Sequence, residues 1–182
     1  MAQLDASHDK LNIPAMAKNP RSIAIVDDDP SVLKALARLL GTHSFATKTY
    51  LSAPQFLASL AEGLPDCLIA DLQMPEMTGL ELQLSLARRG VQIPTIIITA
   101  HDEAGMRERS YPAHIRQPIM IIAAGSDAVV SNAAIEDFAT LLRAGSHLVV
   151  VGAQHELLME QDRYRGQFWA AFDAFVPGTA LY

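Results

Sequence analysis

The chain has 182 residues, half of them hydrophobic, and its 14 Lys and Arg against 20 Asp and Glu give a net charge of −6. This length suits one well-cored α/β domain and is too short for two of ordinary size. The acidic balance, with no basic stripe, argues against a nucleic-acid-binding surface. The sequence has neither the apolar core of a signal peptide nor an apolar run of membrane-spanning length, which favours a cytoplasmic protein.

Residues 1–21 mix polar residues with two prolines and show no sustained period, so they are predicted to form a flexible leader. The ordered α/β domain is expected to occupy residues 22–178. The single cysteine, Cys67, falls inside a predicted strand, which indicates a buried, inert thiol rather than a disulfide or a redox centre.

In the first half of the chain, apolar runs alternate with segments of helical period. The predicted order is strand 22–26, helix 31–40, strand 44–50, helix 53–61, strand 67–71, helix 78–89 and strand 93–98. Ser52 is expected to cap the second helix, and Gly41 and Gly90 to end the first and third. This order implies right-handed crossovers and a sheet with helices on both faces.

Residues 103–117 form the least regular part of the ordered chain and are named the seam below. Beyond the seam the prediction is strand 118–124, helix 132–144, strand 147–151 and helix 157–176. Four aromatic side chains lie on or near one face of the last helix, where core packing is the expected role: Phe168, Trp169, Phe172 and Phe175.

Three of the predicted strands end in polar side chains. One runs into Asp27 and Asp28, another ends at Asp71, and a third runs into Thr99. If the strands are parallel neighbours, these side chains meet at one edge of the sheet, where open α/β folds place their chemistry. Converging carboxylates repel one another unless a cation lies among them, which favours Mg²⁺. The alternative is a solvated set of acids that cap helix N-termini.

Three motifs appear in a fixed order, Val26-Asp-Asp-Asp29, Asp71-Leu-Gln-Met-Pro-Glu-Met-Thr-Gly79 and Ile96-Ile-Ile-Thr-Ala100. Together they closely resemble the receiver domain of two-component response regulators, over about Ser22 to His101. We therefore treat residues 22–102 as the receiver-like part of the domain.

The resemblance implies a phosphoacceptor and a metal site. By it, Asp71 accepts a phosphoryl group and Thr99 hydrogen-bonds that group. Mg²⁺ is held by Asp27, Asp28, Asp71 and the backbone carbonyl of Gln73. The implied partners are a histidine kinase or a small phosphodonor.

The second half carries a different resemblance, over about Ile115 to Pro177. The stretches 119–131 and 150–158 look like the last two strands of a serine α/β-hydrolase of the lysophospholipase or monoglyceride-lipase kind. In that family the residues matching Asp127 and His155 are the acid and base of the catalytic triad. No Gly-x-Ser-x-Gly nucleophile occurs in the chain, so the pair is expected to be vestigial and the chain not to act as a hydrolase.

The chain thus resembles a chimera of a receiver-like part, the seam and a hydrolase-like part (residues 118–178). Because both parent folds are parallel and doubly wound, the prediction is one flavodoxin-like sheet with strand order 2-1-3-4-5-6. The Lys with which receivers end their fifth strand is absent, since the segment reads Ala124-Gly-Ser-Asp127. Mg²⁺ binding is expected to persist and phosphorylation to be impaired.

The sequence is compatible with three functions. The first is a receiver-type signalling module, and the second a chimeric scaffold, engineered or natural, without selected activity. The third, a serine esterase or lipase, is the least favoured because the nucleophile is missing. A homodimer formed through the hydrolase-like part is a further hypothesis.

Overall fold

The computed structural model describes residues 20–99, 115–124, 132–150 and 162–176. The elements in chain order are β1 (Ser22–Val26), α1 (Pro30–Thr42), β2 (Ala46–Tyr50), α2 (Ala53–Ser59), the 3₁₀ turn η1 (Leu60–Glu62), β3 (Cys67–Asp71), α3 (Gly79–Arg88), β4 (Thr95–Thr99), β5 (Ile119–Ala124), α4 (Asn132–Leu141), β6 (Gly145–Val150) and α5 (Asp162–Phe175). Among these helices, none is long and apolar enough to cross a membrane.

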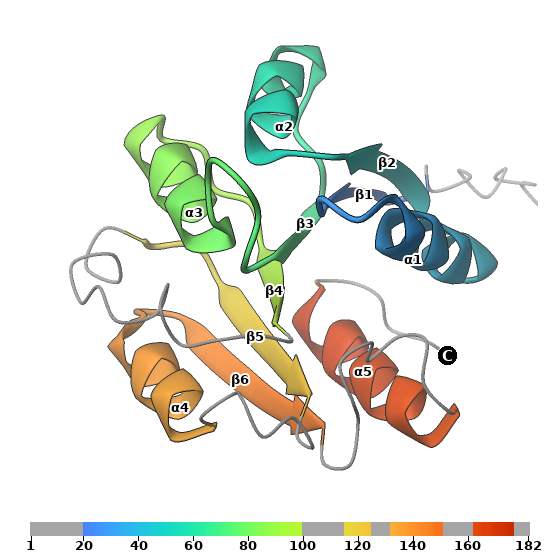
Figure 1. Ribbon diagram of the computed structural model, residues 1–182, viewed down its shortest axis with the longest axis vertical. Coiled ribbons are helices and arrows are strands. Elements are labelled where there is room, and N and C mark those ends of the chain that lie inside the picture. The colour runs from blue at the N-terminus through green and yellow to red at the C-terminus, as the bar shows by residue number, and fades with distance from the viewer. Residues whose placement is uncertain (1–19, 100–114, 125–131, 151–161, 177–182) are drawn as a thin grey trace, which may run out of the picture.

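The six strands form one parallel sheet in the order β2-β1-β3-β4-β5-β6. This confirms the predicted fold class and strand order. The first strand lies inside the sheet and the second at its edge, as expected of a doubly wound fold that begins in the middle. The last strand, β6, forms the opposite edge (Figure 1).

Helices cover both faces of the sheet, as Figure 1 shows. Alternate residues of β1 point to opposite faces. Ile23 and Ile25 belong to the core that α1 and α5 cover, whereas Ala24 and Val26 belong to the core under α2 and α3. The core beneath α4 continues this second face across β4 and β5. Two buried layers therefore hold the carboxyl ends of the strands in place.

The C-terminal helix α5 is part of this core. Phe168 and Phe172 are completely buried, and Phe172 meets the ring of Phe45 edge-on at 5.3 Å between centroids. Trp169 stacks on His43, which follows α1, at 3.8 Å. The expected packing role is confirmed for the two buried phenylalanines. α5 and the first strands of the sheet thus share one hydrophobic layer.

The sequence placed several element boundaries wrongly. Gly41 was expected to end the first helix, but α1 continues to Thr42 and the chain turns at Ser44, which has a φ of 63°. The fourth helix was expected to reach Ala144, but α4 ends at Leu141. Gly145 then starts β6. A Cβ at this position would lie 2.3 Å from the carbonyl oxygen of Ala139, so the turn before β6 requires glycine.

Two side chains singled out by their position in the sequence, Cys67 and Gln117, are buried in the core. Cys67 is fully buried in β3, as predicted, and burial raises the pKa of its thiol to about 12. Gln117, at the end of the seam, is also buried and donates a hydrogen bond of 2.7 Å from Nε2 to Gln83 Oε1 on α3. The rest of the seam before residue 115 lies outside the described residues.

The shared core generates a prediction about cooperativity. Replacing Phe172 by Ala should lower the free energy of unfolding by about 3–5 kcal/mol, because it removes a fully buried ring between α5, α1 and β1. The measurement is urea unfolding followed by circular dichroism and by the fluorescence of Trp169, the sole tryptophan.

Both probes should report one coincident transition in the wild type and in the variant. The matched control is Phe175→Ala in the same helix, where the ring is only half-buried and a smaller loss is expected. An earlier transition in fluorescence than in circular dichroism would show that α5 unfolds separately and would contradict the single cooperative core.

Candidate functional site

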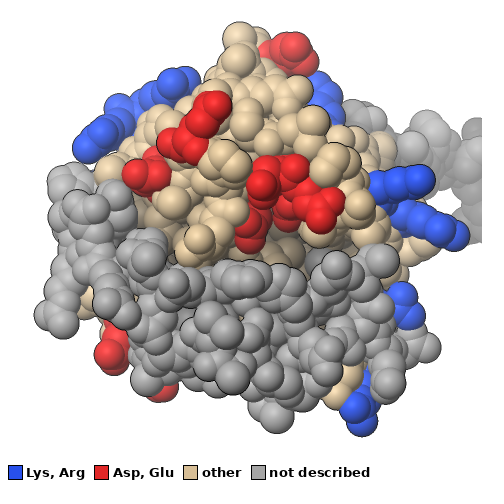
Figure 2. Space-filling view, viewed as in Figure 1, with Lys and Arg blue, Asp and Glu red and all other residues tan. Residues whose placement is uncertain are grey.

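The predicted acidic residues lie at the carboxyl ends of neighbouring strands. β1 pairs with β3 so that Val26 lies beside Ala70, which places Asp27 and Asp71 one residue further along. β3 pairs with β4 so that Asp71 lies beside Ile98, and Thr99 follows. Figure 2 shows acidic side chains gathered near the middle of the described surface, with the basic ones toward its outline.

Asp71 is a half-buried carboxyl at the end of a strand whose other residues are buried. Its Oδ2 accepts a hydrogen bond of 3.0 Å from the backbone N–H of Gln73. The pKa of Asp71 is raised to about 7, first because burial disfavours the charged form and second because of the nearby Asp27 carboxylate. Near neutral pH this carboxyl is therefore close to its midpoint of ionisation.

Asp27 lies in a similar environment at the end of β1. Its Oδ1 accepts a hydrogen bond of 2.8 Å from the backbone N–H of Asp29. Burial raises the pKa of Asp27 to about 6, and the charges of Asp28 and Asp29 act in the same direction. Asp28 and Asp29 are exposed. Asp29 has a structural role too, since its Oδ1 accepts from the N–H of Ser31 and caps α1.

The local sequence explains why Asp71 is held so firmly. After Asp71, the N–H of Leu72 donates to the carbonyl of Ile98, and the N–H of Gly79 donates back to the carbonyl of Leu72. α3 then begins with a capping box in which Thr78 and Glu81 satisfy each other's backbone N–H groups. The loop between strand and helix is thus bonded at both ends.

Gly79 allows this loop to close against the strand. A Cβ at position 79 would lie 2.5 Å from the backbone oxygen of Asp71, a distance that no side chain tolerates. In the sequence this glycine is recognisable only as part of a motif, which does not indicate its steric role. A glycine at the first position of a helix, eight residues after the acid, was the available signal.

The donor groups of the site fit a small divalent cation that retains water. The charged neighbours that shift the pKa of Asp71 are both carboxylates, Asp27 and Asp28, so the cluster lacks charge compensation. Within the described residues, however, no three Asp, Glu, His or Cys side chains converge as a metal-binding group. Carboxylates with a backbone carbonyl suit Mg²⁺, which commonly keeps several waters and takes few protein ligands.

Of the other predicted site residues, the structure describes Thr99 and Gln73. Thr99 is buried at the end of β4, one residue beyond the register partner of Asp71. Gln73 is exposed, and its N–H faces the Asp71 carboxylate. Asp127 and His155 lie outside the described residues, so the geometry of the predicted hydrolase pair is not tested.

A parallel doubly wound sheet with paired carboxylates at the ends of two central strands defines a class of α/β protein with an acidic site at its carboxyl edge. The family model described as Response regulator receiver domain matches residues 23–121, more than half of the chain. The chain therefore belongs to the response regulator receiver domain family.

Individual relatives agree with this assignment. The chain is 42% identical over 91 residues to the response regulator protein TmoT of Ectopseudomonas mendocina, which covers 50% of this chain and 41% of TmoT. It is 35% identical over 136 residues to the transcriptional regulatory protein FixJ of Rhizobium meliloti, covering 72% of this chain and 60% of FixJ. The chain thus spans only part of the length of these relatives.

A solved structure supports the fold. The chemotaxis protein CheY4 of Vibrio cholerae aligns with a TM-score of 0.51 and 15% identity, over 86% of this chain and 98% of that chain. At this level of identity the similarity concerns the fold alone.

The raised pKa of Asp71 predicts how stability depends on pH. Between the ordinary Asp pKa of 3.8 and about 7, the folded protein retains a proton that the unfolded chain releases, so stability falls as pH rises through this window. Without metal, Asp71→Asn should therefore match the wild type near the lower limit and exceed it by roughly 2–4 kcal/mol above the upper one, the upper figure being the full shift at about 1.4 kcal/mol per pKa unit.

Urea unfolding in the presence of a chelator measures this difference. Asp137→Asn, which removes an exposed carboxylate from α4, controls for the change in net charge. An Asp71→Asn variant with the same stability advantage at both ends of the pH range would contradict the assignment.

The steric role of Gly79 gives a further prediction. Gly79→Ala should lower the free energy of unfolding by roughly 1–3 kcal/mol, because either the loop or β3 must move to relieve the contact with Asp71. The control is Gly166→Ala on α5, where nothing lies within 4 Å of the added Cβ. The control should gain up to about 1 kcal/mol from improved helix propensity. If both variants gained stability in urea unfolding, Gly79 would not have the steric role described.

Proposed function

We propose that this chain is a receiver module that binds Mg²⁺ and accepts a phosphoryl group on Asp71. The observation that carries the proposal is the pair of half-buried carboxyls, Asp27 and Asp71, on neighbouring strand ends with both pKa values raised. Such a pair gains from a cation and includes a carboxylate oxygen held at a solvent-accessible edge.

The proposed metal ligands are the carboxylates of Asp27, Asp28 and Asp71 and the backbone carbonyl of Gln73. Asp28 is the most exposed of the three carboxylates. Bound Mg²⁺ would neutralise the charge that builds up on the transferred group. It would also lower the pKa of Asp71, and so keep this carboxylate ionised at neutral pH.

The proposed reaction is a phosphoryl transfer to Asp71. A carboxylate oxygen of Asp71 forms a bond to phosphorus as the bond from phosphorus to the donor's leaving group breaks, and the leaving group departs with the electron pair. The hydroxyl of Thr99 is assigned to a hydrogen bond with the transferred group. The implied donors are a histidine kinase phosphorylated on His or a small phosphodonor.

We propose that transfer is slower than in a receiver with the usual Lys. No Lys occurs after Lys48 anywhere in the chain, so the end of β5 supplies no ammonium for the phosphoryl oxygens. A preorganised cation at developing negative charge commonly contributes a large part of such catalysis. Its loss should lower the rate of phosphorylation more than the affinity for Mg²⁺.

The chimera remains a hypothesis about the second half of the chain. The receiver family match ends at residue 121, inside β5, and leaves most of the hydrolase-like part unassigned. The sheet does continue through β5 and β6 without a break. A scaffold without selected activity is therefore the second candidate, and hydrolase activity the least favoured, since the chain lacks the nucleophile motif.

The charge of this chain bears on its partners. FixJ is named a transcriptional regulatory protein, and the chain covers 60% of it. Since the chain has a net charge of −6 and an acidic site, we propose that it does not itself contact nucleic acid. The cytoplasmic location and a homodimer through residues 118–178 remain predictions.

The experiment is incubation with Mg²⁺ and acetyl phosphate, followed by intact mass measurement. The wild type should gain the mass of one phosphoryl group, and the gain should require Mg²⁺. Asp71→Asn should show no gain, because the amide is not a nucleophile. Asp137→Asn, with an exposed carboxylate removed from α4, should behave as the wild type.

The result separates the two candidate functions. A Mg²⁺-dependent gain that Asp71→Asn abolishes supports the receiver module. Absence of any gain over many hours, with Mg²⁺ binding intact by calorimetry, would contradict phosphoacceptor function and leave the scaffold.

A further inference from the structure

A hollow lies away from the acidic site, between the edge strand β2 and helix α2. It has a volume of about 210 Å³ and borders the first half of β1, from Ser22 to Ala24. Asp27 and the proposed phosphoacceptor edge follow the other end of β1. The hollow is therefore a separate feature of the fold.

The inner wall of this hollow is apolar. Ile23, Ala24 and Phe56 line it, and Phe56 is buried with its ring edge-on to Tyr50 at 5.4 Å. Leu64 lines the same hollow and has 56% of its surface exposed. A small apolar group could thus leave water here without displacing the core.

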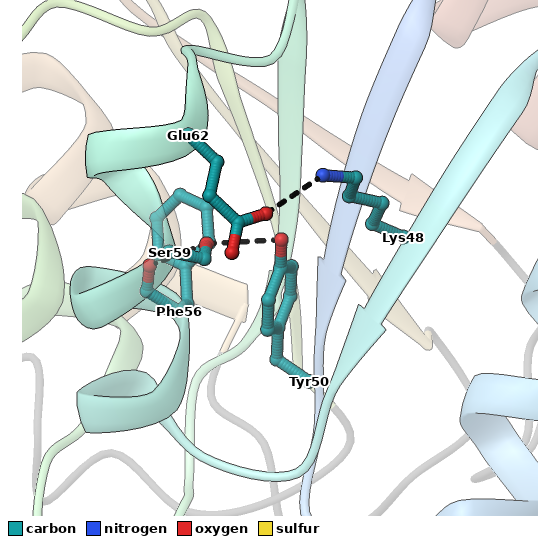
Figure 3. A network of polar contacts seen from close by, with 5 residues as sticks. All are labelled: Lys48, Tyr50, Phe56, Ser59 and Glu62. Carbon is teal, nitrogen blue, oxygen red and sulfur yellow. Dashed lines mark hydrogen bonds and ion pairs between the residues drawn. The ribbon is translucent and has the colours of Figure 1, made fainter.

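The mouth of the hollow carries two opposite charges side by side. Lys48 Nζ on β2 lies 3.2 Å from Glu62 Oε2 at the end of η1, and Figure 3 shows the pair bridging strand and turn. Beneath it, Ser59 Oγ lies 2.9 Å from the hydroxyl oxygen of Tyr50. A neighbouring, more open hollow between β2 and α2 is also lined by Lys48, Tyr50, Ser59 and Glu62. The polar contacts among these four residues therefore lie between the two hollows.

We propose that this hollow binds a zwitterionic α-amino acid with an apolar side chain. The ligand's carboxylate pairs with Lys48, its ammonium group pairs with Glu62, and its side chain enters the apolar wall. The charges of an α-amino acid are separated by about the length of the ion pair that they replace. One pair between protein side chains is exchanged for two pairs with the ligand.

The exposure of the ion pair favours this exchange. The side chains of Lys48 and Glu62 are 67% and 70% exposed, and an exposed pair of this kind contributes little to stability. Separating the two groups therefore costs little. Lys48 makes one ion pair in the described structure, which leaves two of its ammonium hydrogens for a ligand.

The test is an NMR titration of the full chain with L-leucine, read from the backbone amides of Tyr50, Phe56 and Glu62. Saturable, millimolar shifts at these amides are expected. Glycine lacks the apolar side chain, 4-methylpentanoate lacks the ammonium and 3-methylbutylamine lacks the carboxylate. All three should bind more weakly than leucine. For the two analogues that lack one charge, the expected loss is roughly twofold to fivefold in affinity.

Variants of the two charged residues complete the test. Lys48→Met and Glu62→Gln should each weaken leucine binding by roughly twofold to fivefold, since each removes one exposed ion pair with the ligand. Both residues are exposed, so folding should be preserved. The matched control is Lys34→Met on α1, a helix that covers the other face, and it should bind leucine as the wild type does.

Two results would overturn the proposal. The first is the absence of saturable shifts at these amides with leucine in large excess. The second is equal binding of leucine and of either singly charged analogue, because recognition would then not depend on the paired charges. Loss of phosphorylation in Asp71→Asn leaves this site intact, so the two proposals fail separately.

Discussion

Burial of two like charges at one sheet edge is the constraint on which the site depends. Asp27 and Asp71 end neighbouring strands whose preceding residues are almost completely buried, so neither carboxyl can leave the low-dielectric edge without disturbing the core. Burial is the larger cause of both raised pKa values. The Asp27 carboxylate adds to the rise at Asp71, and the Asp28 and Asp29 carboxylates add to the rise at Asp27. The folded state is therefore arranged to gain from a proton or a divalent cation. Because the rest of the fold holds these two strands in place, it also holds the two carboxyls where a bound cation would stabilise their charged forms.

The C-terminal part of the chain contributes to that fixation. β5 and β6 extend the sheet in register, and α5 buries Phe168 and Phe172 against the layer formed by α1, β1 and β3. Stacking of Trp169 on His43 joins α5 to the turn after α1. The last helix of the chain thus supplies the packing that a doubly wound sheet requires on this face.

Much of this architecture could be predicted from the sequence. Apolar runs that end in Asp or Thr placed β1, β3 and β4 within two residues and put the carboxylates at one edge, because strand period and parallel topology are local or general rules. The steric role of Gly79 and the end of α4 were not predicted. The close approaches of Gly79 to the Asp71 carbonyl and of Gly145 to the Ala139 carbonyl exist only once the intervening turns have folded. From the sequence, repulsion between the converging carboxylates was the predicted reason for a bound cation. Burial has the larger effect, and burial is a property of the whole packed sheet.

The most direct test is to measure the ionisation of Asp71 itself, by following its side-chain carboxyl carbon by NMR as a function of pH, with and without Mg²⁺. The account predicts a midpoint near pH 7 without the metal, as burial and Asp27 dictate. With saturating Mg²⁺ the midpoint should fall well below that value, because the cation stabilises the carboxylate. A midpoint near the ordinary value of 3.8 in both conditions would contradict the claim that Asp71 is a buried acid in need of a cation.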